Sequence, residues 1–176
     1  MVFQRTRDGL GTDWAAVYEA SYEDLVRFLY RMVWEDDRAH DLAQETFVRA
    51  LRHDPEQPRA WLFSVARNLA RDEARTAVRR RKHLTLVRAE ESGRVAEDAE
   101  QEMERSERRE AVRLALDRLS ERDREVLLLW DAGLSYDEIA EQTGLARGAI
   151  GTTLSRARQR LVEAHRMGED QNATYL

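Results

Sequence analysis

Hydrophobic side chains recur every three or four residues along most of the chain, which is the period of an amphipathic α-helix. Three such stretches fill the first half of the chain, over residues 14–33, 36–51 and 59–82. The pattern fades over residues 83–106, where acidic residues dominate, and returns at Ala111. We therefore expect an all-α protein of two small helical modules joined by a flexible acidic linker, whose last residues could be helical.

The second module carries helix-start and helix-stop signals at close spacing. Ser120 precedes an apolar helix that Gly133 can end, and residues 135–138 (SYDE) have the form of a capping box that starts the next helix. A helix-turn-helix needs a small residue where its helices cross, a glycine in the turn and an aliphatic residue in the core. Those places are held by Ala140, Gly144 and Ile150.

The helix predicted over residues 146–162 has one apolar stripe and a polar remainder, as a recognition helix in a DNA groove would. The polar face and its flanks carry short hydroxyl side chains, which fit base edges, and arginines, which can reach phosphate or guanine. We predict DNA contacts from this helix by Arg147, Gly148, Thr152, Thr153, Ser155, Arg156, Arg158 and Arg160.

The 176 residues carry a net charge of −5, which conceals segregation along the chain. Acids dominate residues 35–47 and 90–110, whereas arginines dominate residues 67–82 and 144–166. Two basic blocks could be two surfaces that bind a polyanion, or they could be solvated helix faces with many ion pairs. The alternation of all four blocks favours the first interpretation.

Several classes of function lack their sequence signals. The absence of cysteine removes disulfides, thiolate nucleophiles and cysteine zinc sites, and favours a reducing compartment. The four histidines are scattered, and no phosphate loop, nucleophile elbow or paired-carboxylate frame occurs. We predict no catalytic residue, metal or cofactor. Without an apolar run of about 20 residues or a secretory signal, we expect a cytoplasmic protein with no membrane insertion.

The motifs resemble those of bacterial RNA polymerase sigma factors of the extracytoplasmic-function (ECF) group. Residues 119–129 (LSERDREVLLL), 133–140 (GLSYDEIA) and 154–161 (LSRARQRL) are similar to sigma region 4. Residues 41–51 (DLAQETFVRAL) resemble the polymerase-binding helix of region 2, and residues 60–72 (AWLFSVARNLARD) resemble its promoter-opening helix. Both motif sets occur in the family's order.

The resemblance implies a sigma factor that binds core RNA polymerase, recognises the −10 and −35 promoter elements and helps to melt the promoter. It implies region 2 over residues 1–82, a linker over 83–106, region 4 over 107–166 and a disordered tail over 167–176. The implied partners are the β′ clamp helices and β flap of the polymerase, promoter DNA and an anti-sigma factor. The linker would either follow the polymerase interior as a nucleic-acid mimic or act as a plain tether.

The resemblance also assigns residues to region 2. Contacts with the β′ clamp helices fall to Asp41, Gln44, Glu45 and Phe47, although Phe47 could instead belong to the module's core. Unpaired bases of the −10 element would meet a loop at residues 55–58 and the helix that bears Arg59, Arg67, Asn68, Arg71 and Arg75. Trp61 and Phe63 could stack on bases, but the position of Trp61 on the apolar stripe favours the core.

The recognition helix departs from the family at one point. Many relatives have Lys or Arg around the positions of Gly151, Thr152 and Thr153. We therefore expect −35 binding that is either weaker or altered in specificity, with Arg156 contributing an unusual share and Thr153→Arg strengthening it. The main alternative is a helix-turn-helix regulator that acts without polymerase, which leaves residues 41–51 and 60–72 without a purpose. A helical protein-interaction module would leave both basic blocks unexplained.

Overall fold

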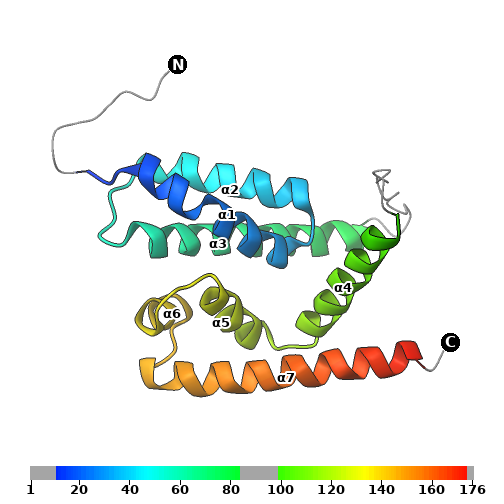
Figure 1. Cartoon of the computed structure of the whole chain (residues 1–176). Coiled ribbons are helices and arrows are strands. Elements are labelled where there is room, and N and C mark those ends of the chain that lie inside the picture. Colours follow the sequence, from blue (N-terminus) through cyan, green and yellow to red (C-terminus); the bar gives the residue numbers. More distant parts are fainter. Residues whose placement is uncertain (1–10, 84–98, 174–176) are drawn as a thin grey trace. The chain divides into compact units, whose positions relative to one another are not determined.

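Seven α-helices form all the regular secondary structure in the part of the chain that the computed structural model describes, residues 11–83 and 99–173 (Figure 1). They are α1 (Trp14–Val33), α2 (Asp36–Ala50), α3 (Pro58–His83), α4 (Ala99–Asp117), α5 (Glu121–Asp131), α6 (Tyr136–Thr143) and α7 (Arg147–Ala173). The all-α prediction is confirmed. Contacts divide the chain between Ala77 and Val78 into two compact units, and each is described by itself.

Helices α1, α2 and α3 of the first unit surround an apolar core (Figure 1). Asp13 caps α1 by accepting hydrogen bonds from the backbone N–H groups of Ala15 and Ala16, which a helix start otherwise leaves unsatisfied. The fully buried ring of Phe63 on α3 meets Phe28 of α1 edge-on, with 5.4 Å between ring centroids. This aromatic pair joins α3 to α1 at the centre of the bundle.

Ion pairs at the margin of that core tie α3 to its neighbours. Arg59 at the start of α3 lies 2.9 Å from Asp24 of α1, and Arg38 of α2 lies 2.7 Å from Glu73 of α3. The hydrogen bond to Glu73 raises the pKa of Arg38 further above its usual range. Because these side chains are partly exposed, each pair contributes at most about 1 kcal/mol, and the apolar core stabilises the bundle.

The turns of the second unit follow the signals in the sequence. Ser120 accepts a hydrogen bond from the Asp123 N–H at 3.1 Å, and Ser135 and Glu138 form both bonds of the predicted capping box. The turns after α5 and α6 contain Gly133 (φ 81°) and Gly144 (φ 71°), in the left-handed conformation that glycine adopts without steric cost. These predictions are confirmed.

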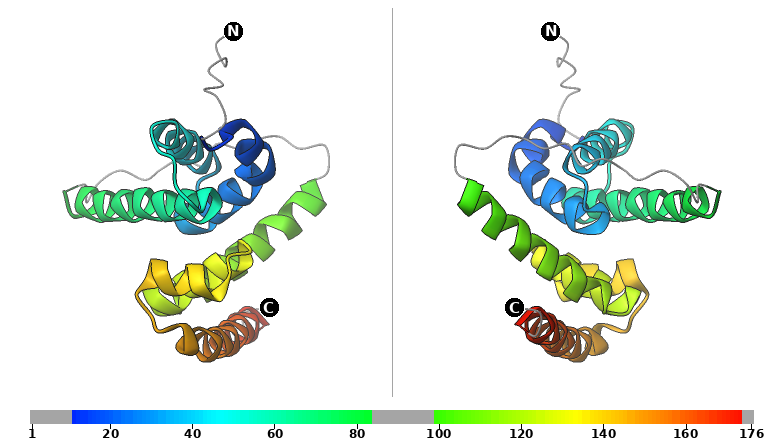
Figure 2. Two further views of the ribbon diagram at one scale, coloured as in Figure 1. Left: turned by 90° about the vertical axis from the view of Figure 1, so that its left-hand side faces the viewer. Right: turned by 90° about the vertical axis from the view of Figure 1, so that its right-hand side faces the viewer.

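Helix α7 packs against α4, α5 and α6, which lie on the same side of it in every view (Figures 1 and 2). Its buried residues fall at helical spacing and include Ile150, Leu154 and Ala157. They meet a core supplied by residues such as Leu129 of α5 and Ile139 of α6. The packing leaves the opposite face of α7 to solvent.

Two helices extend into segments that the sequence pattern left unassigned. Helix α4 begins at Ala99, so the end of the predicted linker is helical, whereas residues 84–98 lie outside the described residues. Helix α7 continues to Ala173, beyond the predicted start of the tail at residue 167. That stretch contains no proline, and Gly168 lowers helix propensity by only about 1 kcal/mol. Loss of apolar periodicity there does not mark the end of the helix.

Candidate nucleic-acid interface

Helix α2 presents an acidic and polar face to solvent. Asp41, Gln44 and Glu45 are all exposed on it, as sequence reasoning requires of a docking surface. Asp41 lies 3.5 Å from Arg38 and Glu45 lies 2.6 Å from Arg49, pairs within one helix that contribute little to stability. The carboxylates therefore remain accessible to a basic partner.

Phe47 belongs to the core of the first unit. Only 8% of its surface is exposed, and its ring meets Tyr18 of α1 edge-on at a centroid distance of 4.9 Å. The Tyr22 hydroxyl lies 3.0 Å from Nδ1 of His40, and burial raises the pKa of Tyr22. Of the two roles that the sequence left open for Phe47, the structure supports packing.

A cavity of about 470 Å³ opens between the end of α2, the loop at residues 51–57 and α3. This volume lies within the range of small-ligand pockets, about 300–1,000 Å³. Its lining includes Glu45, Arg49, Arg52, His53, Trp61 and Asn68. An indole ring, an imidazole and an amide together suit a planar base, and charge beside them comes from Arg52 and from Arg49, which pairs with the Glu45 carboxylate at 2.6 Å.

The predicted −10 residues occupy different places around α3. Asn68 is exposed and lines the cavity, whereas Arg75 is exposed farther along and lies 3.6 Å from Asp72. Arg67 and Arg71 are half-buried. The Arg59 guanidinium stacks on Phe63 at 5.0 Å in addition to pairing with Asp24, so it also supports the fold.

The two aromatic residues of α3 have separate roles. Phe63 is fully buried and cannot stack on a base. Trp61 is half-buried and forms a wall of the cavity, with its ring centroid 6.1 Å from that of Trp14 and 4.9 Å from that of His53. The prediction of a core position for Trp61 is thus only partly correct, because the buried stripe of α3 runs through Phe63 and Trp61 lies on the other side of the helix.

Sequence reasoning missed the residues that hold the loop beside this cavity. Thr12 donates hydrogen bonds to Oδ1 of Asp54 from its backbone N–H at 2.8 Å and from its hydroxyl at 2.6 Å. These bonds lower the pKa of Asp54. The Trp14 indole N–H donates to the carbonyl of His53 at 3.1 Å. The one available sequence signal was a tryptophan at the start of an amphipathic helix, which equally fits plain packing.

The solvent face of α7 carries Thr152, Ser155 and Arg156, all exposed. Gly148 is also exposed, and a Cβ atom added there would meet nothing within 4 Å. A helix with this composition allows close approach of its backbone to a DNA groove. Arg156 extends from the centre of the face opposite the buried stripe, where the helical wheel places it.

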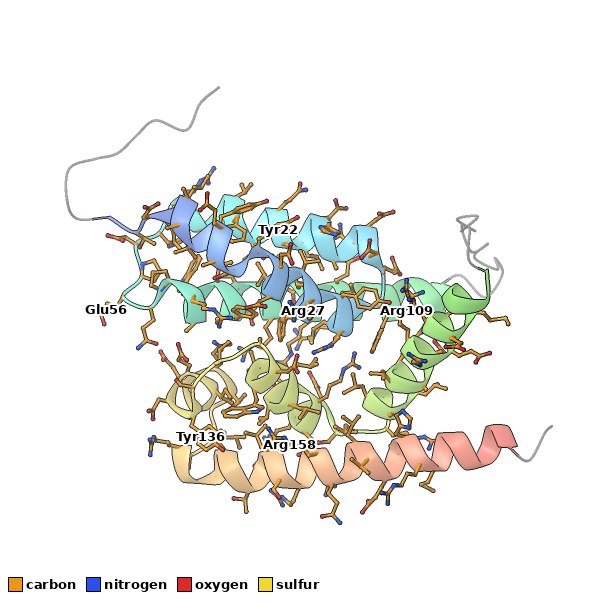
Figure 3. All side chains as sticks on the ribbon, in the orientation of Figure 1. Tyr22, Arg27, Glu56, Arg109, Tyr136 and Arg158 are labelled. Carbon is orange, nitrogen blue, oxygen red and sulfur yellow. The ribbon has the colours of Figure 1, made fainter. Side chains whose placement is uncertain are left out.

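The other three predicted arginines of α7 have partners within the second unit. Arg147 lies 2.5 Å from Asp137 of α6, and Arg160 pairs with the largely buried Asp123 of α5. The Arg158 guanidinium lies 5.7 Å from the centre of the Trp130 ring. Figure 3 shows Arg158 and Tyr136 on the side of α7 that faces α5 and α6. Arg158 and Arg160 therefore contribute to the packing of the second unit as well as to its positive charge.

The structure corrects the assignment of Thr153 to the DNA-binding face. Only 4% of Thr153 is exposed, and its hydroxyl donates to the backbone carbonyl of Ala149 at 2.8 Å. The helical wheel placed Thr153 on a flank of the solvent face. The helices packed against α7 cover that flank, so the buried stripe is wider than the apolar side chains alone indicate.

Within residues 11–75 and 103–167, whose side chains are described, no group of three or more His, Cys, Asp or Glu side chains could hold a metal ion. Among the described helices, none is long and apolar enough to span a bilayer.

Comparison with known families gives matches in both units. Residues 17–80 match the family model "Sigma-70 region 2", and residues 109–161 match "Sigma-70, region 4". The RNA polymerase sigma factor YlaC of Bacillus subtilis is 31% identical over 158 residues, which cover 82% of this chain and 87% of that protein. The ECF RNA polymerase sigma factor EcfG of Rhodopseudomonas palustris is 35% identical over 150 residues, covering 81% and 79% respectively.

Solved structures are similar as well. The sigma factor RpoE of Bartonella quintana, in complex with the anti-sigma factor NepR, aligns with a TM-score of 0.65 and 27% identity over 86% of this chain and 96% of that one. CnrH in complex with the cytosolic domain of CnrY aligns with a TM-score of 0.56 at 23% identity, over 85% of each chain, and shows the fold alone.

The sequence pattern alone predicts that an arginine at position 153 strengthens DNA binding, but the burial of Thr153 predicts that it destabilises the fold. Thr153→Arg should lower the free energy of unfolding by about 2 kcal/mol or more, because the side chain must displace packed neighbours and lose hydration. Thr152→Arg, one residue earlier on the exposed face, should change it by less than about 0.5 kcal/mol. Denaturant unfolding of the full chain, followed by circular dichroism, measures both. Equal stability of the two variants would contradict the burial of Thr153.

Proposed function

This chain belongs to the sigma factors of RNA polymerase, in the extracytoplasmic-function group, and from that membership we propose how its two units divide the work of initiation. The chain binds core RNA polymerase and directs it to promoters. The single observation that carries this function is the presence of regions 2 and 4 on one chain, in order, with relatives matched over most of their own length. Its place of action is the cytoplasm, and its role is that of an initiation factor without chemistry of its own.

We assign region 2 to residues 1–82, the linker to 83–106 and region 4 to 107–166. In region 2 the exposed face of Asp41, Gln44 and Glu45 meets the β′ clamp helices of the polymerase. The acidic charge of this face supports the assignment, since a basic surface would gain both steering and register from it. Phe47 holds the face in place from beneath, and its burial supports this role.

The cavity between α2 and α3 is where region 2 captures an unpaired base of the −10 element. Trp61 supplies a stacking surface, and Asn68 supplies donors and acceptors for a base edge. Arg67, Arg71 and Arg75 follow the backbone of the displaced strand along α3. This division supports promoter melting, because a base held outside the duplex lowers the free energy of the opened state.

Region 4 reads the −35 element with α7. Thr152, Ser155 and Arg156 supply the contacts to bases and phosphates, and Arg147 and Arg158 border them. Gly148 lets the backbone approach closely. The β flap of the polymerase and an anti-sigma factor are further partners of the chain, the latter on the analogy of the RpoE complex with NepR.

Run-off transcription tests the function directly. Purified chain added to core polymerase on genomic fragments of the source organism should yield transcripts that start at discrete sites and are absent with core polymerase alone. A helix-turn-helix regulator that acts without polymerase would bind duplex fragments yet give no new start sites. That outcome would refute the proposed function.

Charge reversal tests the docking face. Asp41→Lys combined with Glu45→Lys should weaken the affinity for core polymerase at least about tenfold, because attraction becomes repulsion at a charged interface. The matched control is Glu19→Lys with Glu23→Lys, an exposed pair on α1 at the same spacing and with the same charge change. Affinity is measured by fluorescence anisotropy, with circular dichroism to verify the helix content. An equal effect of both pairs would indicate charge alone and contradict the assignment.

Salt titration tests the DNA face of α7. Arg156→Ala should either cost about 1–3 kcal/mol at one base position or weaken binding to every sequence and reduce the salt slope by about one. Arg166→Ala, an exposed arginine farther along the same helix, removes the same charge and should have the smaller effect. The measurement uses the full chain on −35 duplexes identified from the run-off start sites, with scrambled controls. Wild-type binding by Arg156→Ala at every salt concentration would show that this face does not meet DNA.

A further inference from the structure

The loop between α2 and α3 is held by residues that precede and begin α1, far away in sequence. Asp54 accepts two hydrogen bonds from Thr12, at 2.8 and 2.6 Å, across 42 residues of chain. His53 accepts one from the Trp14 indole through its backbone carbonyl at 3.1 Å, across 39 residues. We call Thr12 and Trp14 the N-terminal clamp.

The clamp acts on both sides of the cavity. His53 and Trp61 line it from the loop and from α3, and their ring centroids are 4.9 Å apart. The Trp14 ring lies against Trp61 with 6.1 Å between centroids. One side chain thus fixes the loop through its N–H group and the wall of the cavity through its ring.

Local hydrogen bonds restrain the first part of the loop, where the backbone N–H groups of Arg52 and His53 donate to the carbonyls of Arg49 and Ala50 at 3.3 and 2.9 Å. Residues 51–54 are exposed, and the helices on either side end at Ala50 and restart at Pro58. An exposed loop that becomes ordered only on binding loses about 1–2 kcal/mol of conformational entropy for each residue fixed. The clamp orders His53 and Asp54 before a ligand binds, so that this entropy does not reduce the affinity for the ligand. It also fixes the shape of the cavity that the ligand meets.

The clamp is also separable from the fold. Its hydrogen bonds are exposed to solvent, whereas the first unit is stabilised by a buried core around Phe28 and Phe63. Exposed hydrogen bonds contribute little to net stability, since water replaces them when they break. Loss of the clamp should therefore alter the cavity without unfolding the helices.

We propose that Thr12 and Trp14 are positioning residues for base capture: they hold His53 and Trp61 in the arrangement that binds one unpaired base of the −10 strand and selects among bases there. The inference rests on the proposed function of the cavity. Neither residue touches the base. Each acts through the loop or through the wall of the cavity.

The test measures base preference position by position. Holoenzyme assembled from core polymerase and the full chain is mixed with a pool of single-stranded DNA of 30 nucleotides, of which the central eight are randomised, and the bound fraction is sequenced. Trp14→Phe keeps a ring but removes the N–H donor, and Thr12→Val keeps the shape but removes the hydroxyl. The double variant should lose about five- to tenfold of its preference at one position, the size of a lost stacking or edge contact, with the other positions unchanged.

Asp54 provides the matched pair. Asp54→Asn retains an oxygen that can accept from Thr12 and should keep the wild-type preference, whereas Asp54→Ala loses both bonds from Thr12 and should weaken the preference at the same position. Wild type, the double variant and the two Asp54 variants should bind core polymerase with affinities that agree within about twofold. Their thermal unfolding temperatures should agree within a few degrees.

Three results would overturn the inference. Wild-type preference in the double variant would show that the clamp does not position the cavity. An equal loss at every position, or a parallel loss of polymerase affinity, would show a general structural role. Absence of any base preference in wild-type holoenzyme would refute the proposed function of region 2 itself, a result distinct from the other two.

Discussion

The burial of Phe63 against Phe28 sets the rotation of α3, and the direction of every residue proposed to meet DNA on that helix depends on it. At about 100° per residue, Trp61, Val65 and Asn68 fall within one sector of about 60° on the side opposite Phe63. All three line the cavity. A rotation of α3 that buried Trp61 instead would turn this sector inward and remove the site. The position of one phenyl ring in the core therefore determines which groups a DNA strand would meet.

Local features of this fold could be predicted from the sequence because their causes lie within a few residues. The cap at Ser120, the box at Ser135 and Glu138, and the glycine turns involve neighbours in the chain, so their residue types suffice. The rotation of α3 could not be predicted in this way. Its sequence offers apolar residues on two opposite sides of the helix, one through Trp61 and one through Phe63, and packing against α1 chooses between them.

Long-range pairs explain the remaining differences between expectation and structure. The charge of α7 and its helical wheel predict DNA contacts by its arginines, and the structure adds that Arg160 pairs with Asp123 across 37 residues and that Arg158 lies over Trp130. Thr153 is polar and was therefore predicted to be exposed, but the neighbouring helices cover it. Charge and polarity along a helix identify the surface in outline. Which of these side chains form contacts within the protein depends on residues far away in sequence, and the periodicity of one helix does not reveal them.

The division of the chain near Ala77 bears on how the protein is made. The described contacts that hold the loop, the cavity and the core of the first unit all lie within residues 12–73. The ribosome delivers these residues first, and helical bundles with short-range contacts fold within micro- to milliseconds, whereas synthesis proceeds at about 5–20 residues per second. The first unit can thus be complete while the recognition helix is still being translated.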